Sequence, residues 1–295
     1  MSFTLPASLA RGDLIAVVAP ATGVDRRRFD PGLAWLKEHY RILMLPSIFE
    51  ESGYLAGSDM RRRDELGSAM LDPEVKAIFA ARAGYGSMRI VSQLPWDAFA
   101  ARPKWIVGFS DICALHLETT ARRIASLHGP VVTTLSGMPS DARDDFLKLL
   151  EGRATTVSFP RLGALAPGLA EGILVGGNLS LLVMMAAGGR LDLPEGCILA
   201  IEDTTETPYR IDRMLTALRL GGHLHRAAGI VLGDWVHCQP DADGVTAMEA
   251  IASCLGDLGI PVYAGATFGH GGINTPFVLG SDATLGNGEL ISRIG

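Results

Sequence analysis

Mainly apolar runs alternate with helical patterns through the first half of the chain, and this alternation constrains the fold most strongly. Residues 14–19, 75–81 and 105–107 are typical of strands that are buried on both faces, and residues 29–40 carry helical spacing. Strands that are joined by helices need crossover connections, so the sequence predicts a parallel sheet with both faces covered. Ligands of such sheets bind at the carboxyl ends of the strands.

The second half of the chain follows a different pattern. Residues 154–169 are rich in Gly and Pro and show no clear periodicity, which predicts a linker. Strand-like runs at 197–201 and 229–233 follow, with helical patterns between them and a glycine-rich tail of short β-like runs. We therefore expect an α/β protein, with an N-terminal Rossmann-like parallel-sheet domain at 1–153 and a distinct C-terminal α+β domain at 170–295.

Charge and composition exclude several classes of function. The net charge is −6 and no extended basic run occurs, so we expect no nucleic-acid partner. The most apolar stretch, 173–187, is interrupted by Gly176 and Asn178 and is shorter than the roughly 20 residues that a membrane span needs. The first residues lack a signal-peptide pattern, and the four cysteines are widely spaced, as expected for reduced thiols. These features predict a cytoplasmic protein without membrane attachment.

A serine stands at the junction of a strand and a helix. The segment Gly108-Phe109-Ser110-Asp111-Ile112 directly follows the buried run 105–107. A serine on such a sharp turn projects its hydroxyl from the sheet edge, and the next backbone N–H can help to bind an oxyanion. A Ser or Asp that merely caps the helix is the other interpretation, and the local sequence leaves both open. Ile112 replaces the last Gly of Gly-x-Ser-x-Gly, so an α/β-hydrolase fold is not indicated.

An acid and a histidine in the second half could complete a catalytic triad. Glu202 ends an apolar strand and could orient an imidazole, although Asp203 and Glu206 compete for this role. His270 is flanked by glycines, which permit unusual backbone angles, and histidine is the natural base for a serine. The other histidines form no metal-ligand pattern, so we expect no metal site.

The glycine-rich segment Gly84-Tyr85-Gly86 follows a predicted strand and invites a dinucleotide-binding interpretation. That interpretation fails because Arg89 occupies the third Gly position, and no acid ends a strand about 20 residues later. We therefore expect no cofactor. The turn could instead expose backbone N–H groups that form the other half of an oxyanion hole.

Taken together, these segments resemble the LD-carboxypeptidase family. The similarity includes Gly108-Phe109-Ser110-Asp111-Ile112 and Phe268-Gly269-His270, and it extends in order through nearly the whole chain. One departure is Ala83, where the family usually has glycine. The other matching segments are 53–59, 62–66, 72–78, 82–86, 128–130, 176–179 and 202–215.

The resemblance implies a metal-independent serine peptidase with a Ser–Glu–His triad. It assigns Ser110 as the nucleophile, Glu202 as the orienting acid and His270 as the base. We expect the backbone N–H groups of Gly84 and Asp111 to form the oxyanion hole. The implied reaction is hydrolysis of the L,D amide bond of murein tetrapeptides, which releases D-alanine during peptidoglycan recycling, and members of the family are commonly homodimers.

The same resemblance leaves two alternative functions open. A microcin-immunity-type peptidase would cleave peptidyl-nucleotide antibiotics and would need an aromatic clamp for the base. The four tryptophans fit core or helix positions, which disfavours this option: Trp35, Trp96, Trp105 and Trp235. A non-catalytic muropeptide-binding relative is the second alternative, and the presence of Ser110, Glu202 and His270 argues against it.

Overall fold

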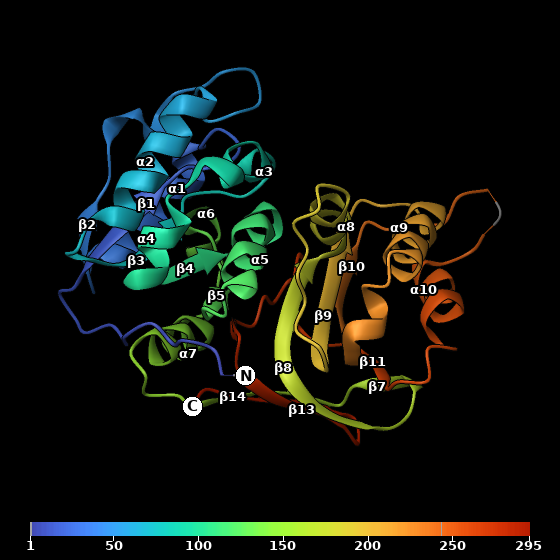
Figure 1. Cartoon of the computed structure of the whole chain (residues 1–295). Coiled ribbons are helices and arrows are strands. Elements are labelled where there is room, and N and C mark those ends of the chain that lie inside the picture. The colour runs from blue at the N-terminus through green and yellow to red at the C-terminus, as the bar shows by residue number, and fades with distance from the viewer. Residues whose placement is uncertain (1, 243) are drawn as a thin grey trace. The chain divides into compact units, whose positions relative to one another are not determined.

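The computed structural model describes residues 2–242 and 244–295 of the chain. The chain divides between Ala154 and Thr155 into two compact units, which we call unit 1 and unit 2 (Figure 1). None of the helices in the described residues is long and apolar enough to cross a membrane.

Unit 1 is built on a parallel sheet, as the sequence predicts. Its strands have the order β5-β4-β3-β1-β2, and every neighbouring pair is parallel. The order reverses between β1 and β3, and ligand sites of doubly wound folds lie at such a reversal. The strands are β1 (Leu14–Val18), β2 (Arg41–Leu43), β3 (Val75–Ala80), β4 (Trp105–Gly108) and β5 (Ser126–His128).

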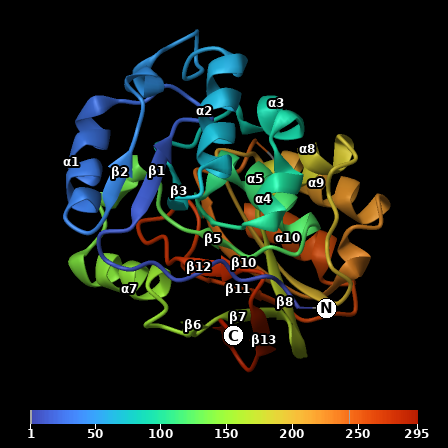
Figure 2. The same ribbon diagram turned by 60° about the vertical axis from the view of Figure 1, so that its left-hand side comes forward.

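Helices cover both faces of this sheet. Successive residues of a strand point to opposite faces, so a strand that is apolar throughout places apolar side chains on both faces, and each face needs a cover. Ile78 and Ile106 pack in one apolar cluster with residues of α2, α4 and α5. The next residue along β3, Phe79, instead contacts Phe146 of α7, with ring centroids 6.1 Å apart. Figure 2 shows these layers. The helices are α1 (Arg26–Lys37), α2 (Asp59–Leu71), α3 (Ser87–Ile90), α4 (Trp96–Ala101), α5 (Cys113–Ala121), α6 (Val132–Leu135) and α7 (Ser140–Leu150), with short 3-10 turns η1 (Pro46–Phe49), η2 (Val91–Gln93) and η3 (Ser110–Ile112).

Side-chain caps fix where the two longest helices of unit 1, α1 and α2, begin. The Ser58 hydroxyl accepts the backbone N–H of Arg61 at 3.2 Å, so α2 begins at Asp59. The Asp25 carboxylate accepts the N–H of Arg27 in the same way. The helix expected at 29–40 therefore begins three residues earlier than its apolar pattern indicates.

Unit 2 contains an eight-stranded mixed sheet with the order β6-β14-β13-β8-β9-β10-β11-β7. Strands β8 to β11 are parallel neighbours, and the remaining pairs are antiparallel. The strands are β6 (Thr156–Pro160), β7 (Gly163–Ala166), β8 (Leu169–Asn178), β9 (Cys197–Thr204), β10 (Ala227–Val236), β11 (Val262–Ala264), β13 (Asp282–Gly286) and β14 (Glu289–Arg293), and β12 (Phe277–Leu279) is a further strand of the same unit.

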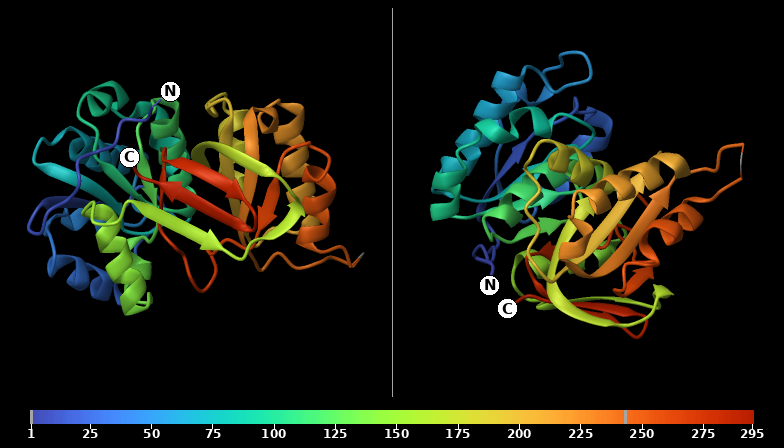
Figure 3. Two further views of the ribbon diagram at one scale, coloured as in Figure 1. Left: turned by 90° about the horizontal axis from the view of Figure 1, so that it is seen from below. Right: turned by 45° about the vertical axis from the view of Figure 1, so that its right-hand side comes forward.

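The sheet of unit 2 curls around an apolar interior. Strands β6 and β7 stand at opposite ends of the sheet order, yet only residues 161 and 162 separate them. Figure 3 shows the long strand β8 bending with the sheet. Inside, Phe268 packs edge-on against Phe159 and Phe277, with ring centroids 5.9 and 5.1 Å apart. Helices α8 (Leu179–Ala187), α9 (Pro208–Leu220) and α10 (Ala247–Leu255) lie side by side outside the sheet, and η4 (Leu224–Arg226) is a short 3-10 turn.

The segment 154–169, which the sequence predicts to be a linker, is instead largely strand. It contains β6 and β7, and β8 begins at Leu169. Phe159 of β6 pairs with Leu290 of β14, and Ala166 of β7 pairs with Val262 of β11. These partners lie almost 100 residues or more away along the chain. Pairing with distant strands therefore determines that β6 and β7 are strands, and their own sequence shows no local periodicity.

Candidate active site

Ser110 stands on a strained turn directly after β4. Its φ is 60°, in the left-handed region that residues other than glycine seldom adopt. The turn is tight, since a Cβ at Gly108 would lie 2.9 Å from the Ile112 side chain. The N-cap positions of η3 and α5 are occupied by Phe109 and Ile112, so neither Ser110 nor Asp111 is the N-cap of these helices. The backbone at Ser110 thus has the form of a nucleophile-bearing strand-to-helix turn, not of a helix cap.

Asp111 connects this serine turn to the glycine-rich turn. Its carboxylate is fully buried and accepts the backbone N–H groups of Gly86 at 3.2 Å and Ser87 at 2.8 Å. Burial raises the pKa of the Asp111 carboxyl, and the hydrogen bonds from Ser87 and Gly86 oppose this rise. The residue after Ser110 therefore also holds the turn that follows β3.

The glycine-rich turn requires its glycines. Gly84 has a φ of 116°, and a Cβ there would lie 2.2 Å from Thr22 Oγ1, the atom that accepts the N–H of Tyr85 at 3.0 Å. Ala83 has no positive φ, so its methyl group is accommodated. Within the described part of the chain, the N–H groups of Gly84 and Asp111 donate to no acceptor. Both remain available to an external oxyanion.

In unit 2, a histidine and a buried acid form a short hydrogen bond. His270 Nδ1 lies 2.6 Å from Glu202 Oε2, although the two residues are 68 positions apart. Glu202 lies in β9 and is fully buried. Its other oxygen accepts Asn178 Nδ2 at 3.3 Å, and Asn178 stands opposite it on β8. A neutral His270 that donates from Nδ1 keeps the lone pair on Nε2, which is the arrangement of a general base.

The loop that carries His270 can approach Glu202 only because it contains glycine. Gly269 has a φ of 114°, and a Cβ there would lie 2.6 Å from Glu202 Oε2. The Gly269 N–H donates to Asn274 Oδ1 at 3.1 Å, and the Gly271 N–H donates to Asp234 Oδ2 at 3.0 Å. These contacts fix the loop on both sides of the imidazole.

The two competing acids have other partners. Asp203 accepts the N–H and the hydroxyl of Ser180 at 2.9 and 2.8 Å, which anchors the start of α8. Glu206 lies 3.7 Å from Arg210. Thr207, the residue after Glu206, occupies the N-cap of α9. Of the three acids considered, Glu202 is the one that contacts His270.

Comparison with known proteins places the chain in a family. Residues 15–129 match the LD-carboxypeptidase N-terminal domain, and residues 171–285 match the LD-carboxypeptidase C-terminal domain. A putative carboxypeptidase of Synechocystis is 39% identical over 96% of this chain and 95% of its own length. The chain belongs to the LD-carboxypeptidase family.

Other members of the LD-carboxypeptidase family have more specific names. The murein tetrapeptide carboxypeptidase of Pseudomonas aeruginosa is 30% identical over 94% of both chains. The crystal structure of muramoyltetrapeptide carboxypeptidase from Oxalobacter formigenes superposes with a TM-score of 0.84 at 27% identity, covering 96% of this chain and 98% of the other. The chain is therefore related to carboxypeptidases that are named for murein peptides.

The electrostatics around His270 favour its protonated form more than water does. Burial alone lowers the pKa of His270, but the hydrogen bond and charge of Glu202, with the charges of Asp203 and Asp234, outweigh burial and raise it. Burial raises the pKa of Glu202, and the hydrogen bonds from His270 and Asn178 oppose this. The pair is thus arranged to stabilise an imidazolium next to a buried acid.

Sequence reasoning missed the residues that hold this pair. Asn178 lies in a segment that matches the family, but nothing in its local pattern links it to Glu202. Asp234 directly follows the strand-like run 229–233, so its place near the carboxyl end of β10 could have been a usable signal. In the described residues, no group of three or more His, Cys, Asp or Glu is placed to hold a metal ion.

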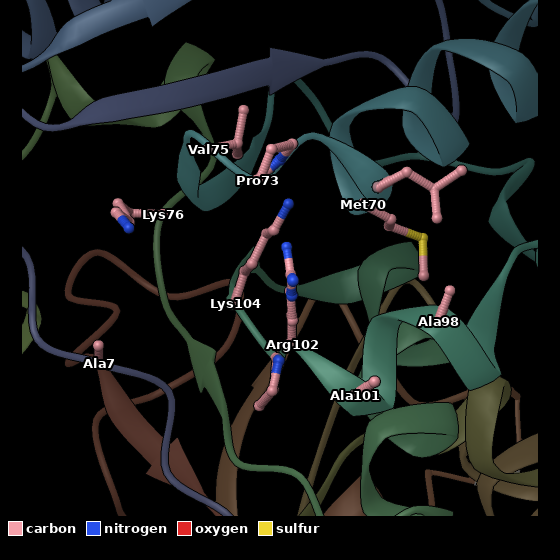
Figure 4. Close-up of a pocket in the computed structure, with 11 residues that line it drawn as sticks. Ala7, Met70, Pro73, Val75, Lys76, Ala98, Ala101, Arg102 and Lys104 are labelled. Atoms are coloured by element: carbon pink, nitrogen blue, oxygen red, sulfur yellow. The ribbon is translucent and has the colours of Figure 1, made fainter.

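A cavity of about 470 Å³ lies elsewhere in unit 1 (Figure 4). Val75 and Lys104 line it at the beginnings of β3 and β4, so it opens at the sheet edge opposite to Ser110. Lys104 is almost fully buried, and its Nζ donates to the carbonyls of Ala69, at 3.0 Å, and Asp72. Lys104 thus binds carbonyl groups at the C-terminal end of α2. The cavity is not part of the candidate active site.

Proposed function

We propose that this protein is a serine carboxypeptidase that hydrolyses the L,D amide bond of murein tetrapeptides and releases D-alanine during peptidoglycan recycling. The observation that carries the proposal is the 2.6 Å hydrogen bond between His270 Nδ1 and the buried Glu202. The strained turn at Ser110 supplies a nucleophile of the right kind. Relatives named murein tetrapeptide carboxypeptidase and probable murein peptide carboxypeptidase support the substrate class.

The proposed reaction is acyl transfer through Ser110. His270 Nε2 takes the proton of the serine hydroxyl while Oγ attacks the scissile carbonyl carbon, and Glu202 stabilises the imidazolium that forms. The N–H groups of Gly84 and Asp111 receive the negative charge on the carbonyl oxygen. The amide C–N bond then breaks as His270 returns the proton to the departing amine of D-alanine.

A second half-reaction restores the enzyme. His270 takes a proton from water, which attacks the carbonyl carbon of the acyl-Ser110 ester. The bond from that carbon to Oγ then breaks as His270 returns the proton to Oγ, and the shortened peptide leaves with a new carboxylate. Both half-reactions use the same base and the same oxyanion donors. The proposal therefore needs no metal ion, and we expect turnover to be unchanged by EDTA.

Incubation with purified tetrapeptide and pentapeptide muropeptides, read by mass spectrometry, tests the proposal. We expect loss of one D-alanine from the tetrapeptide with the wild-type enzyme, with and without EDTA, and no loss with Ser110→Ala. Activity that EDTA abolishes and zinc restores would overturn the serine mechanism. Binding of muropeptides without any product would instead favour a non-catalytic receptor.

The microcin-immunity-type activity is tested in the same assay. The Microcin C7 self-immunity protein of Escherichia coli is 25% identical over 90% of this chain, so its class of substrate is a natural control. Trp96 and Trp105 are buried, and their Nε1 atoms donate to carbonyls of Val91 and Ala7, which leaves neither as an aromatic clamp. We expect aspartyl sulfamoyl adenosine to be cleaved much more slowly than the tetrapeptide.

The proposal includes a cytoplasmic location and a homodimeric state, which the family resemblance implies. Cell fractionation with an antibody against the protein tests the location. Light scattering coupled to size-exclusion chromatography tests the oligomeric state, and a single mass near 31.3 kDa would exclude the dimer.

A further inference from the structure

Helix α2 carries an arginine that is entirely buried. Arg62 has 0% exposed surface and is the largest fully buried side chain among the described residues. Moving a charged guanidinium group out of water costs much free energy. A buried guanidinium is therefore found only where hydrogen bonds and an opposite charge compensate for the lost hydration. The partners of Arg62 therefore show what its position is for.

Those partners are two turns at the carboxyl edge of the sheet. Arg62 Nη1 donates to the carbonyl of Pro20, after β1, and to the carbonyl of Gly86, after β3, at 2.8 Å for the latter. Nη2 forms an ion pair with Asp59 at the start of its own helix. A Cβ at Gly86 would lie 2.7 Å from Nη1, so glycine at 86 is what lets the guanidinium reach the turn.

The other peptide groups of the glycine-rich turn are held as well. Thr22 Oγ1 accepts the N–H of Tyr85, and the Asp111 carboxylate accepts the N–H groups of Gly86 and Ser87. Arg62 holds the same turn through the Gly86 carbonyl. The peptide groups from 84 to 87 are thus fixed one after another, and the N–H of Gly84 at the head of the turn is left without a partner in the described residues.

We propose that Arg62 is a positioning residue, which fixes the glycine-rich turn so that the Gly84 N–H points at the oxyanion. This inference rests on the proposed serine mechanism. An oxyanion donor acts mainly in the transition state, so misplacing it lowers kcat and leaves KM nearly unchanged. Asp111, one residue after Ser110, holds the turn from the other side, and nucleophile and oxyanion donor are therefore set by one connected network.

Arg61 provides a matched control on the same helix. Its side chain is 10% exposed and donates to the carbonyls of Ala19 at 3.1 Å and Ala56 at 2.8 Å, and to Glu65 at 2.6 Å. It holds neighbouring turns as Arg62 does, but in the described part of the chain its side chain makes no hydrogen bond to residues 84–87. Replacing Arg61 should lower stability as much as replacing Arg62, without the same loss of reactivity.

The test compares Arg62→Lys and Arg62→Met with Arg61→Lys and Arg61→Met. Lysine keeps the positive charge but lacks the planar guanidinium group that lets arginine donate to two carbonyls and a carboxylate at once. For each protein we would measure the melting temperature, kcat and KM on the tetrapeptide, and the rate at which a fluorophosphonate labels Ser110. We expect both Arg62 variants to lose about 10- to 100-fold in kcat and in labelling rate, with KM within about threefold of the wild type.

Asp59→Asn keeps the test decisive if both Arg62 variants fail to fold. Asp59 is partly exposed, and the asparagine amide that replaces its carboxylate should weaken the ion pair that anchors Arg62. We expect a smaller, few-fold loss in kcat and in labelling rate, with little change in melting temperature. Wild-type labelling rates in the folded variants, or equal losses in the Arg61 and Arg62 pairs, would overturn the role of Arg62. If the wild-type Ser110 is not labelled at all, the serine mechanism itself fails, which is a distinct result.

Discussion

The proposed catalytic residues of unit 1 and those of unit 2 are held in place by different means. In unit 1, Ser110 is fixed by its own backbone, with a φ of 60° between a strand and a helix that are adjacent in sequence. In unit 2, His270 is fixed by side chains, through Glu202 on β9 and a loop held by Asp234 and Asn274. The position of the proposed nucleophile is therefore a product of local chain geometry, and the position of the proposed base is a product of contacts over long sequence distances.

This difference predicts which substitutions the surroundings of Ser110 and of His270 can tolerate. A side chain at position 110 can be replaced without altering the strained turn, because the strain belongs to the backbone. Around His270, in contrast, each partner contributes directly to the direction of the imidazole. We therefore expect replacement of Ser110 itself to abolish turnover while the fold is kept, and replacement of the residues around His270 to lower turnover by amounts that differ from one partner to the next.

Ser110→Ala should have the largest effect of all single changes. Removing the nucleophile of a triad typically lowers kcat by several orders of magnitude. The melting temperature should stay close to that of the wild type, because Ser110 is only partly buried and the turn remains. Turnover of the tetrapeptide and a thermal melt measure both quantities. More than about a tenth of wild-type activity in the variant would show that another group is the nucleophile.

Glu202→Gln should have the second largest effect and distinguishes between the acids of unit 2. An amide can select the wrong imidazole tautomer, so we expect kcat to fall by about 10³- to 10⁴-fold with little change in stability. Glu206→Gln is the control. It loses a partly exposed ion pair with Arg210, which contributes at most about 0.5 kcal/mol, and it should keep its turnover. If the Glu206 variant were inactive and the Glu202 variant active, the assignment of the acid would be wrong.

Gly269→Ala should have an intermediate effect, on both activity and stability. Its Cβ would meet Glu202 Oε2 and the residue would keep a φ of 114°, so the backbone strain costs about 1–3 kcal/mol and displacement of His270 lowers kcat by about 10²-fold. Gly272→Ala, in the same loop, is the matched control because its Cβ would meet no atom within 4 Å. Chemical denaturation and turnover compare the two. Equal behaviour of both variants would contradict the role of the close approach.

Asp234→Asn should have the smallest effect, on the pH dependence alone. The base must be neutral to accept a proton, so kcat/KM rises with pH through the pKa of His270, which lies above its ordinary value. Asp234 contributes to that rise through its charge, and asparagine keeps an oxygen for the Gly271 N–H. The acid limb of the pH–rate profile should therefore move to lower pH while the plateau hardly changes. A move to higher pH would contradict this sign.

Much of the architecture follows from the sequence by itself. Continuous apolar runs predict β1, β3 and β4, because a strand buried on both faces has no polar side. The turn at Ser110 is also local: a strand that ends at Gly108 and a helix that begins within a few residues leave little room for another path. Sequence resemblance in turn indicated the family, which the comparisons confirm.

Only the tertiary structure decided how Glu202, His270 and their supporting residues meet. Asp203 and Glu202 are neighbours in sequence, yet the alternation of side chains along β9 gives one to His270 and the other to Ser180. Strands β6 and β7 likewise have no signature of their own, because their partners lie far along the chain. The sequence determines what each segment can form, and long-range pairing of strands and buried polar groups decides which of these segments come together.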